Sequence, residues 1–313
     1  MFYFNLLLPI VEQRCKRGRE SMNIDGVFSG GGIKGFALVG AFEVLEEKGY
    51  QFERVAGTSA GAILASFVAA GYTAKEIEKL LDELDLETFL DARKFIIPLP
   101  FMKWLRLYKR LGVYEGKALE QWIFDKLAQK GIYSFADLPE GALKIVASDL
   151  TNGKMLVLPD DLEHYGVSAK SFPVARAVRM SCSIPFFFEP IKMKVGTDDT
   201  IIVDGGVLSN FPMWLFQDED RRKKRPIIGL KLSGSKDEGE GFKIANAFQL
   251  FEALFSTMKN AHDDRYISRE HEKDVVFIPV EHVGATAFQM EDEKKVEMMA
   301  IGRTRTEQFL RFW

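Results

Sequence analysis

The sequence predicts an α/β fold with three layers, α/β/α, in which a mostly parallel central sheet lies between helices. Two successive units of strand, glycine-containing loop and helix occupy residues 22–71. Strands that alternate with helices run parallel, because the crossover helix returns the chain to the same end of the sheet. Further apolar runs of strand length continue the alternation, and two long helical patterns complete the C-terminal part of the chain.

Length and composition fit one large globular unit. The chain has 313 residues, 47% hydrophobic and 28% charged, which excludes a disordered chain and a fibrous repeat. The 42 basic and 45 acidic side chains nearly cancel, so we expect no nucleic-acid partner. Two cysteines, Cys15 and Cys182, cannot form a disulfide framework, and a reducing cytoplasm is therefore the predicted location.

The N-terminal segment differs from the rest. Its apolar run, Phe2–Val11, has about ten residues, whereas a membrane-spanning helix needs about twenty. The run lacks the preceding basic region and the small-residue cleavage site of a signal peptide. A polar tract then continues to Ser21. We expect residues 1–21 to be a flexible N-terminal extension and residues 22–313 to form one domain.

Apolar periodicity defines the first two strand–helix units. Asn23–Phe28 reads as a short strand, and apolar residues at helical spacing follow over residues 36–45. Phe52–Ala56 is the second predicted strand, which leads through a loop into a helix of small residues ending near Gly71.

The remaining elements follow the same two periodicities. In chain order we predict a helix capped by Thr73 and running through Leu84, the aromatic and basic stretch Phe95–Leu111, a helix over Gly116–Lys130, strands over Leu143–Leu150 and Lys154–Leu158, a helix over Val174–Ser181, strands over Thr200–Val203 and Pro226–Leu232, a helix over Phe242–Arg269, a strand over Asp274–Pro279 and a helix over Glu291–Phe312.

The first candidate for chemistry is the sequence Gly-Thr-Ser-Ala-Gly at residues 57–61, between the second strand and its helix. A serine on such a turn is held in a strained conformation that presents its hydroxyl at the edge of the sheet. Gly57 and Gly61 are then needed, because strand and helix pass too close for a β-carbon. The helix N-terminus favours a developing alkoxide. Ser59 is thus a candidate nucleophile, and a purely structural turn is the alternative.

The second candidate is a Gly-x-Gly-x-x-Gly loop after the first strand, formed by Gly30, Gly31, Gly32 and Gly35. Such a loop can hold the phosphate of a dinucleotide at a helix N-terminus. That interpretation needs an acidic residue at the end of the second strand, where the serine turn stands instead. The same backbone amides can form an oxyanion hole, and adjacent parallel strands bring the loop and Ser59 to one edge of the sheet.

The third candidate is Asp204, which is followed by Gly205 and Gly206 at the end of a predicted strand. Its carboxylate could point across the same edge of the sheet toward Ser59. Asp-Gly is also a common turn signal, so the motif taken alone favours a turn.

A serine nucleophile usually relies on a histidine base, and the chain has four histidines. Three of them are predicted in a polar loop or on a charged helix. His282, just after a predicted strand, occupies a plausible catalytic loop. A triad of the α/β-hydrolase type, formed by Ser59, Asp204 and His282, therefore stays open as an alternative.

Together and in this order, the motifs resemble those of the patatin-like phospholipases. The resemblance rests on the glycine loop with Lys34, on the serine turn and on Asp204 with its two glycines. The segments Arg179–Pro185 and Phe188–Pro190 also resemble the family's stretch before the aspartate. The resemblance implies a patatin-like α/β fold and makes residues 22–313 the catalytic domain.

By this resemblance, Ser59 is the nucleophile and Asp204 the general base of a Ser-Asp dyad. The backbone amides of Gly31 and Gly32 form the oxyanion hole, and Lys34 stands where the family carries a basic residue. The implied reaction is hydrolysis of ester bonds in phospholipids or related acyl lipids, without a cofactor or a metal ion. Because an ordinary aspartate is a weak base, we expect Asp204 to be partly desolvated, with a raised pKa.

The stretch over residues 95–111 can place aromatic and apolar side chains on one helical face and basic side chains on the other. This pattern fits a peripheral contact with anionic lipid at the inner membrane face, and it also fits a core helix with a solvated basic face. The expected partner is a lipid or acyl-ester substrate, and we predict no particular oligomeric state. A nucleotide-binding or non-catalytic regulatory module that uses the Gly30–Gly35 loop remains a further alternative.

Overall fold

The computed structural model describes residues 22–83, 86–91, 107–216, 225–233, 244–245, 247–266, 272–280 and 292–313. Its strands are β1 (Met22–Phe28), β2 (Tyr50–Thr58), β3 (Gly112–Tyr114), β4 (Leu143–Asp149), β5 (Lys154–Leu158), β6 (Phe186–Phe188), β7 (Ile191–Val195), β8 (Asp198–Asp204), β9 (Ile227–Ser233) and β10 (Val275–Pro279).

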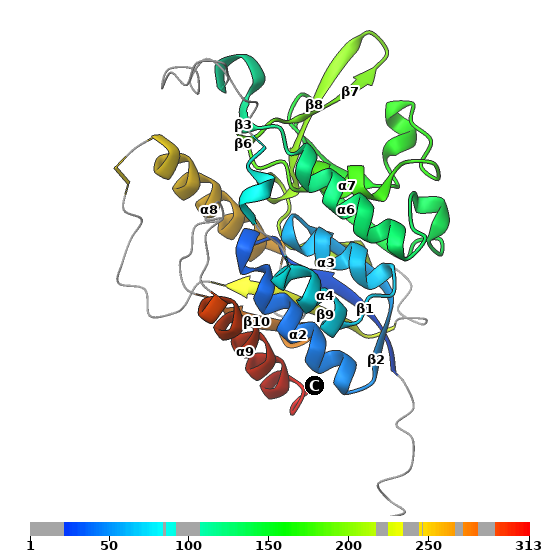
Figure 1. Ribbon diagram of the computed structural model, residues 1–313, viewed down its shortest axis with the longest axis vertical. Coiled ribbons are helices and arrows are strands. Elements are labelled where there is room, and N and C mark those ends of the chain that lie inside the picture. The colour runs from blue at the N-terminus through cyan, green and yellow to red at the C-terminus, as the bar shows by residue number, and fades with distance from the viewer. Residues whose placement is uncertain are drawn as a thin grey trace, which may run out of the picture.

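An eight-stranded mixed sheet forms the centre of the molecule (Figure 1). Seven strands follow the order β10-β9-β1-β2-β4-β8-β7, and β5 also pairs with β4. The strands from β10 to β4 are mutually parallel, whereas β5, β7 and β8 pair in antiparallel fashion. Short strands β3 and β6 form a separate parallel pair. The predicted class, a mostly parallel sheet flanked by helices, is confirmed.

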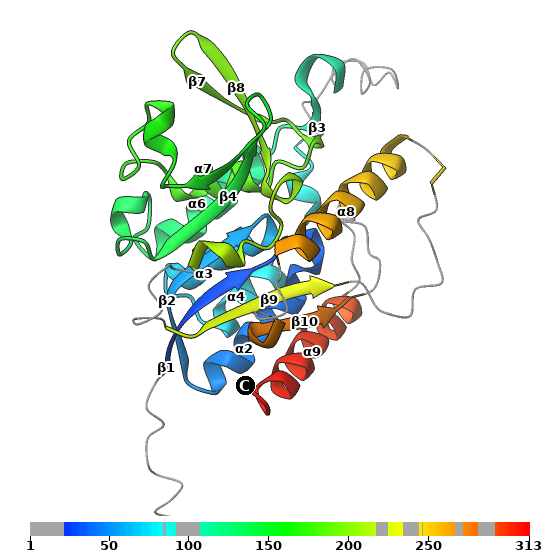
Figure 2. The ribbon, with the colours of Figure 1, turned by 180° about the vertical axis from the view of Figure 1, so that it is seen from behind.

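The helices are α2 (Gly35–Glu47), α3 (Ala60–Ala69), α4 (Ala74–Asp82), α6 (Lys117–Gln129), α7 (Val174–Ser181), α8 (Ala247–Tyr266) and α9 (Asp292–Phe309). Seen from behind, strands β1, β4 and β9 lie in front of helices α2, α3 and α4 (Figure 2). The opposite face of the sheet is covered by a 3-10 helix at Met213–Phe216 and by one end of α8.

Most predicted elements are present within a few residues of their expected bounds. Helix α7 begins and ends as predicted, and Thr73 caps α4 through a reciprocal capping box with Glu76. Strands β3, β6 and β7 were not predicted from the sequence, because they are short or lie at a sheet edge. The predicted extension, residues 1–21, lies outside the described residues.

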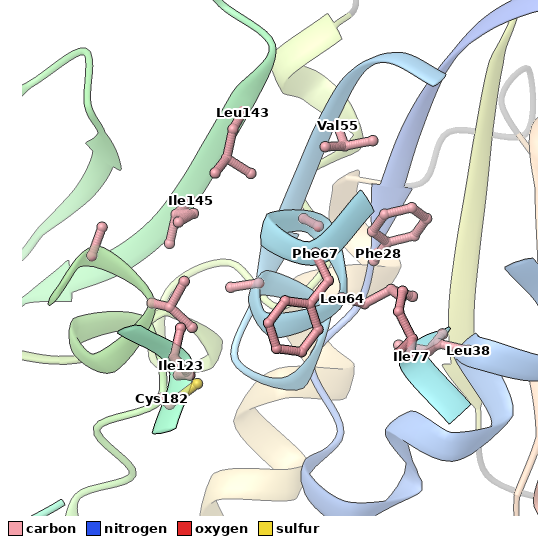
Figure 3. Close-up of a cluster of buried hydrophobic side chains, with 14 of the residues drawn as sticks. Phe28, Leu38, Val55, Leu64, Phe67, Ile77, Ile123, Leu143, Ile145 and Cys182 are labelled. Carbon is pink, nitrogen blue, oxygen red and sulfur yellow. The ribbon is translucent and has the colours of Figure 1, made fainter. Parts of the chain in front are cut away.

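The main core lies between the sheet and helix α3 (Figure 3). Phe28 from β1, Ile145 from β4 and Phe67 from α3 are fully buried members of this core. Val27, the neighbour of Phe28, faces the other side of the sheet and packs with Phe211. Successive residues of β1 therefore serve two cores, as expected for a strand covered on both faces. Burial of each large apolar side chain contributes about 1.5–3 kcal/mol.

None of the helices in the described ranges is both long enough and apolar enough to cross a membrane.

Candidate functional site

Ser59 occupies the turn between β2 and α3. Its backbone angles are φ 54° and ψ −122°, a left-handed conformation that is strained for a residue with a β-carbon. The residue is 7% exposed and stands at the N-terminus of α3. This is the geometry of a nucleophile elbow, where a tight strand-to-helix turn presents a serine hydroxyl.

The two flanking glycines are required by close backbone contacts. A β-carbon on Gly57 would lie 2.2 Å from the carbonyl oxygen of Gly61. A β-carbon on Gly61 would lie 2.2 Å from the carbonyl oxygen of Phe28, at the end of β1. The serine turn is therefore pressed against the neighbouring parallel strand and against the glycine loop that follows it.

The backbone of Ser59 is fixed by a buried side chain that the sequence reading did not single out as a site residue. Its N–H donates to Ser181 Oγ at 2.9 Å, and the Ser181 hydroxyl donates to the Val146 carbonyl of β4 at 2.6 Å. Ser181 thus connects the serine turn to the adjacent strand. Because the Ser59 N–H is engaged, an oxyanion at this site needs donors from elsewhere.

Asp204 reaches the site from the antiparallel part of the sheet. Strand β8 runs against β4, with Asp204 opposite Ala147, whereas Thr58 of β2 lies opposite Val146. Ser59 and Asp204 therefore lie on either side of β4 at nearly the same level. The sheet brings them together because β8 ends midway along β4, and not because the two strands run in the same direction.

The Asp204 carboxylate is almost completely buried. Its Oδ1 accepts the Gly206 N–H at 2.7 Å, and within the described part of the chain Oδ2 has no hydrogen-bond partner. The Ser59 hydroxyl lies close enough to lower the Asp204 pKa, although no formed hydrogen bond joins the two. Such contacts are often long before substrate binds.

Burial dominates the electrostatics of Asp204. It raises the pKa of the carboxyl from 3.8 to about 6, against the opposing effects of the Gly206 N–H, the Ser59 hydroxyl and the charge of Lys259 on α8. The carboxylate is thus ionised at neutral pH and a stronger base than an exposed aspartate. Burial also raises the pKa of the nearby Cys182 thiol, which stays protonated.

The glycine loop packs directly on the serine turn. A β-carbon on Gly30 would lie 3.2 Å from Ser59 Cβ, and a β-carbon on Gly35 would lie 3.3 Å from Ala60 Cβ. No hydrogen bond from the N–H of Gly31 or Gly32 is found within the described ranges. Amides at the start of a helical segment are available to an anion. Lys34 is the last residue of the 3-10 helix Gly32–Lys34 that follows.

A segment that the sequence reading missed joins the three motifs. The Thr58 hydroxyl donates to the Ser209 carbonyl at 3.0 Å, and the Gly30 N–H donates to the Asn210 carbonyl at 3.0 Å. Ser209 and Asn210 follow Asp204, Gly205 and Gly206 after one short turn. In the sequence, Ser209 and Asn210 are two polar residues between apolar neighbours, and this pattern is the signal by which the segment could have been found.

A second buried group outside the sequence reading's site residues is Arg179 on α7, which is fully buried. Its guanidinium donates to the carbonyls of Glu115, Gly116 and Glu189 and to Ser183 Oγ. Burial lowers the Arg179 pKa to about 10, so the group remains charged at neutral pH. This cation holds together the segments around α6, α7 and β6, which border the site.

An apolar cavity of about 120 Å³ opens beside Ser59. It is lined by Ile33 from the 3-10 helix before α2, by Phe36 from α2, and by Ala60, Ile63 and Leu64 from α3. Side chains of α4, α6 and the β6 region complete the lining. Cys182 contributes its neutral thiol to the wall. A hydrocarbon group attached to an acyl carbonyl at Ser59 would find a matching surface there.

The other predicted sites lie away from this centre or outside the described residues. His164 is exposed on a 3-10 turn, near Asp161. His282 and residues 95–106 of the aromatic, basic stretch lie outside the described residues. No group of three or more His, Cys, Asp or Glu side chains arranged for a metal ion is found within the described ranges.

Comparisons with known proteins identify relatives of this arrangement. A family model described as patatin-like phospholipase matches residues 26–216. The chain is 56% identical to the protein YqhO of Bacillus subtilis over 292 residues, which cover 93% of this chain and 99% of that protein. It is 25% identical over 198 residues to an NTE family protein of Mycobacterium tuberculosis, covering 63% of this chain and 46% of that protein.

Two solved structures share the fold. VipD from Legionella pneumophila superposes with a TM-score of 0.56 at 19% identity, covering 94% of this chain and 67% of that one. ExoU from Pseudomonas aeruginosa gives a TM-score of 0.52 at 19% identity, covering 94% and 53%. At this low sequence identity, the similarity shows a shared fold and nothing further.

Proposed function

The chain belongs to the patatin-like phospholipase family, and from this premise we propose that it hydrolyses ester bonds of phospholipids or related acyl lipids through a Ser59–Asp204 dyad. Family membership supports lipid acyl hydrolysis as the general activity. The individual roles follow from the chemistry of the residues at the site.

One observation carries the proposal. A serine in a strained turn, at the wall of an apolar cavity, lies beside a buried carboxylate whose Oδ2 has no hydrogen-bond partner in the described part of the chain. A purely structural role would not explain a buried carboxylate oxygen without a hydrogen-bond partner, because an ionised carboxylate is costly to desolvate. A base that accepts the serine proton explains both features.

Acylation begins with transfer of the Ser59 proton to Asp204 Oδ2 as Ser59 Oγ attacks the ester carbonyl carbon. The amides of Gly31 and Gly32 donate to the resulting oxyanion, and each such donor stabilises it by about 3–4 kcal/mol. Collapse of the tetrahedral intermediate breaks the ester C–O bond. The leaving alcohol takes the proton from Asp204, and the acyl group remains on Ser59.

Deacylation repeats these steps with water as the nucleophile. Asp204 accepts a proton from the water molecule as its oxygen attacks the acyl carbonyl, and the same amides hold the oxyanion. Ser59 then leaves and recovers its proton from Asp204, and the fatty acid is released. The Asp204 pKa of about 6 suits both directions of proton transfer near neutral pH.

The alternatives have less support. The triad requires His282, whereas Asp204 itself lies within reach of Ser59 in the described geometry. A nucleotide-binding loop would leave the strained serine and the buried aspartate without a purpose, and family membership favours the hydrolase.

We also propose a cytoplasmic protein that contacts the membrane surface near residues 95–111. Tyr108, at the described end of this stretch, is 83% exposed, and Lys109 and Arg110 beside it are also exposed. An aromatic ring next to two cations suits the interface of an anionic bilayer. Cosedimentation with anionic vesicles, weaker for a Tyr108→Ala variant and absent with neutral vesicles, tests this contact.

The test of the nucleophile is active-site labelling with a fluorophosphonate, together with hydrolysis of a p-nitrophenyl acyl ester. We expect the wild-type protein to be labelled once per chain, and Ser59→Ala to lose both labelling and turnover because the Ser59 hydroxyl forms the acyl-enzyme, whereas the buried Cys182 thiol stays protonated. Ser66→Ala is the matched control, since Ser66 is a buried serine of α3 whose hydroxyl donates to the Ile63 carbonyl of the same helix. Full turnover by a folded Ser59→Ala variant would refute the mechanism.

A further inference from the structure

The cavity beside Ser59 extends along helix α3. Ser59, Ile63 and Phe67 all line it, and each is four residues from the next. Residues at this spacing lie on one face of a helix, and eight residues correspond to about 12 Å of helix length. The cavity therefore leads from the nucleophile toward the far end of α3, where Phe67 projects into the core layer (Figure 3).

Aromatic rings close this far end. The Phe67 and Trp122 rings meet edge to face, with centroids 5.6 Å apart, and the Phe89 ring meets Trp122 in the same way at 5.6 Å. All three side chains line the cavity. Edge-to-face contacts between aromatic rings are favourable and orient the rings relative to one another, so the three side chains form one ordered floor.

The volume in front of this floor is small. An apolar protein cavity of about 150 Å³ accepts benzene, a molecule of six carbons. The present cavity measures about 120 Å³. A close-packed interior does not expand readily to admit further methylene groups. The described cavity therefore has room for an acyl chain of about six carbons between Ser59 and the aromatic floor.

We propose that Trp122 is the residue that sets the length of the acyl chain this enzyme accepts, with a preference for groups of about six carbons. The inference rests on the proposed function, because it places the acyl group on Ser59. Trp122 is a specificity-determining residue of the acyl site and takes no part in proton transfer or oxyanion binding.

Trp122 differs from the two phenylalanines in its position. Phe67 and Phe89 are buried, and their removal would leave enclosed voids in the core. Trp122 lies on α6 and is only partly buried. Truncation of its side chain therefore extends the cavity toward the surface, and the void can take up either water or substrate.

The experiment measures kcat/KM for p-nitrophenyl esters with acyl chains of four to twelve carbons. We expect the wild-type enzyme to peak near the hexanoyl ester. In Trp122→Ala the optimum should move to a longer chain, and the ratio of kcat/KM for decanoyl to hexanoyl ester should rise at least tenfold. Trp122→Leu, which leaves a smaller opening, should give an intermediate shift and covers the case in which the alanine variant is unstable.

Trp313→Ala is the matched control. It removes another partly buried indole that packs between aromatic rings, on Tyr50 and Phe309, but that does not line the cavity. Its chain-length profile should equal that of the wild type.

The outcomes separate the two proposals. If wild-type protein hydrolyses none of these esters and is not labelled at Ser59, the proposed function fails. If the wild type is active but both Trp122 variants, folded by circular dichroism, keep its chain-length optimum, the role of Trp122 is overturned while the hydrolase assignment stands. A wild-type optimum at twelve carbons would also overturn the limit near six.

Discussion

The two sides of Ser59 differ in physical character. Toward β8, the wall is polar and includes a buried carboxylate that lacks a partner for one oxygen within the described residues. Toward α4 and α6, the wall is apolar and its aromatic side chains pack on one another. The apolar side stabilises the fold through burial, whereas the polar side lowers stability through a desolvated charge. A protein selected for stability alone would have two apolar sides.

The strained backbone of the serine turn lowers the stability of the fold, as the buried charge does. A non-glycine residue with positive φ costs about 1–3 kcal/mol and persists only where its surroundings fix it. Two contacts fix the turn: the Ser59 N–H donates to Ser181 Oγ, and the glycine loop packs close to the Ser59 β-carbon. Stability supplied elsewhere in the core maintains this geometry, and the proposed role of Ser59 as nucleophile gives a reason for it.

The largest expected effect is that of Asp204→Asn, which should lower the activity while raising the stability of the fold. An amide cannot accept the Ser59 proton, so kcat/KM should fall by about 10⁴- to 10⁶-fold, the range over which serine enzymes lose activity without their base or the carboxylate that orients it. His282→Ala should cost less than tenfold in the dyad mechanism. If His282→Ala folds normally but is as inactive as Ser59→Ala, the dyad is wrong and the triad is favoured.

The same Asp204→Asn variant should be more stable than the wild type at neutral pH. The Asp204 pKa is about 6 in the folded protein and near 3.8 in the unfolded chain, so between these values the folded state binds more protons. Stability therefore falls as the pH rises from 4 to 6, and above pH 6 the charge costs about 3 kcal/mol. Denaturant unfolding should show a gain for the variant at pH 8 that disappears at pH 4.

The pH dependence of catalysis gives the next largest effect. Because protonated Asp204 cannot act as the base, kcat/KM should fall about tenfold per unit below pH 6, or about hundredfold at pH 4. This fall in kcat/KM below pH 6 should persist in His282→Ala. If a histidine were the base, kcat/KM would instead fall below about pH 6.5, and the His282→Ala variant would lose its activity altogether. Initial rates on one short-chain ester, with circular dichroism at each pH, provide the measurement.

The difference between the two sides also explains what the sequence could predict. Ser59 and the glycine loop belong to consecutive parallel strands, so local motifs and one topological rule suffice to bring them together. Asp204 was predicted from its motif, but its place beside Ser59 depends on the register of β8, which is antiparallel to β4. Register between strands distant in the chain depends on tertiary packing, which no local pattern encodes.

The supporting contacts were harder to predict for the same reason. Ser181 and Arg179 are ordinary polar residues in a short helix, and their role comes from backbone carbonyls contributed by distant segments. The apolar cavity likewise arises where α3, α4 and α6 fail to fill the space between them. Its lining residues have the periodicity of ordinary core residues, and periodicity alone does not distinguish a packed core from a cavity.

The smallest expected effect is that of Ser181→Ala, which removes the hydroxyl that accepts the Ser59 N–H. The variant leaves the buried Ser59 N–H without its acceptor, so the free energy of unfolding should fall by about 2 kcal/mol. The serine turn should shift slightly, and since small misplacements of a reacting group are costly, kcat/KM should fall about tenfold with little change in KM. Ser183→Ala, also a buried serine of this region but one bonded to Arg179, serves as the control for loss of a buried hydroxyl. It should reduce stability without a comparable loss of kcat, since its hydroxyl bonds to Arg179 and not to the Ser59 backbone. Equal losses of kcat in both variants would show that general destabilisation, and not the position of Ser59, limits the activity.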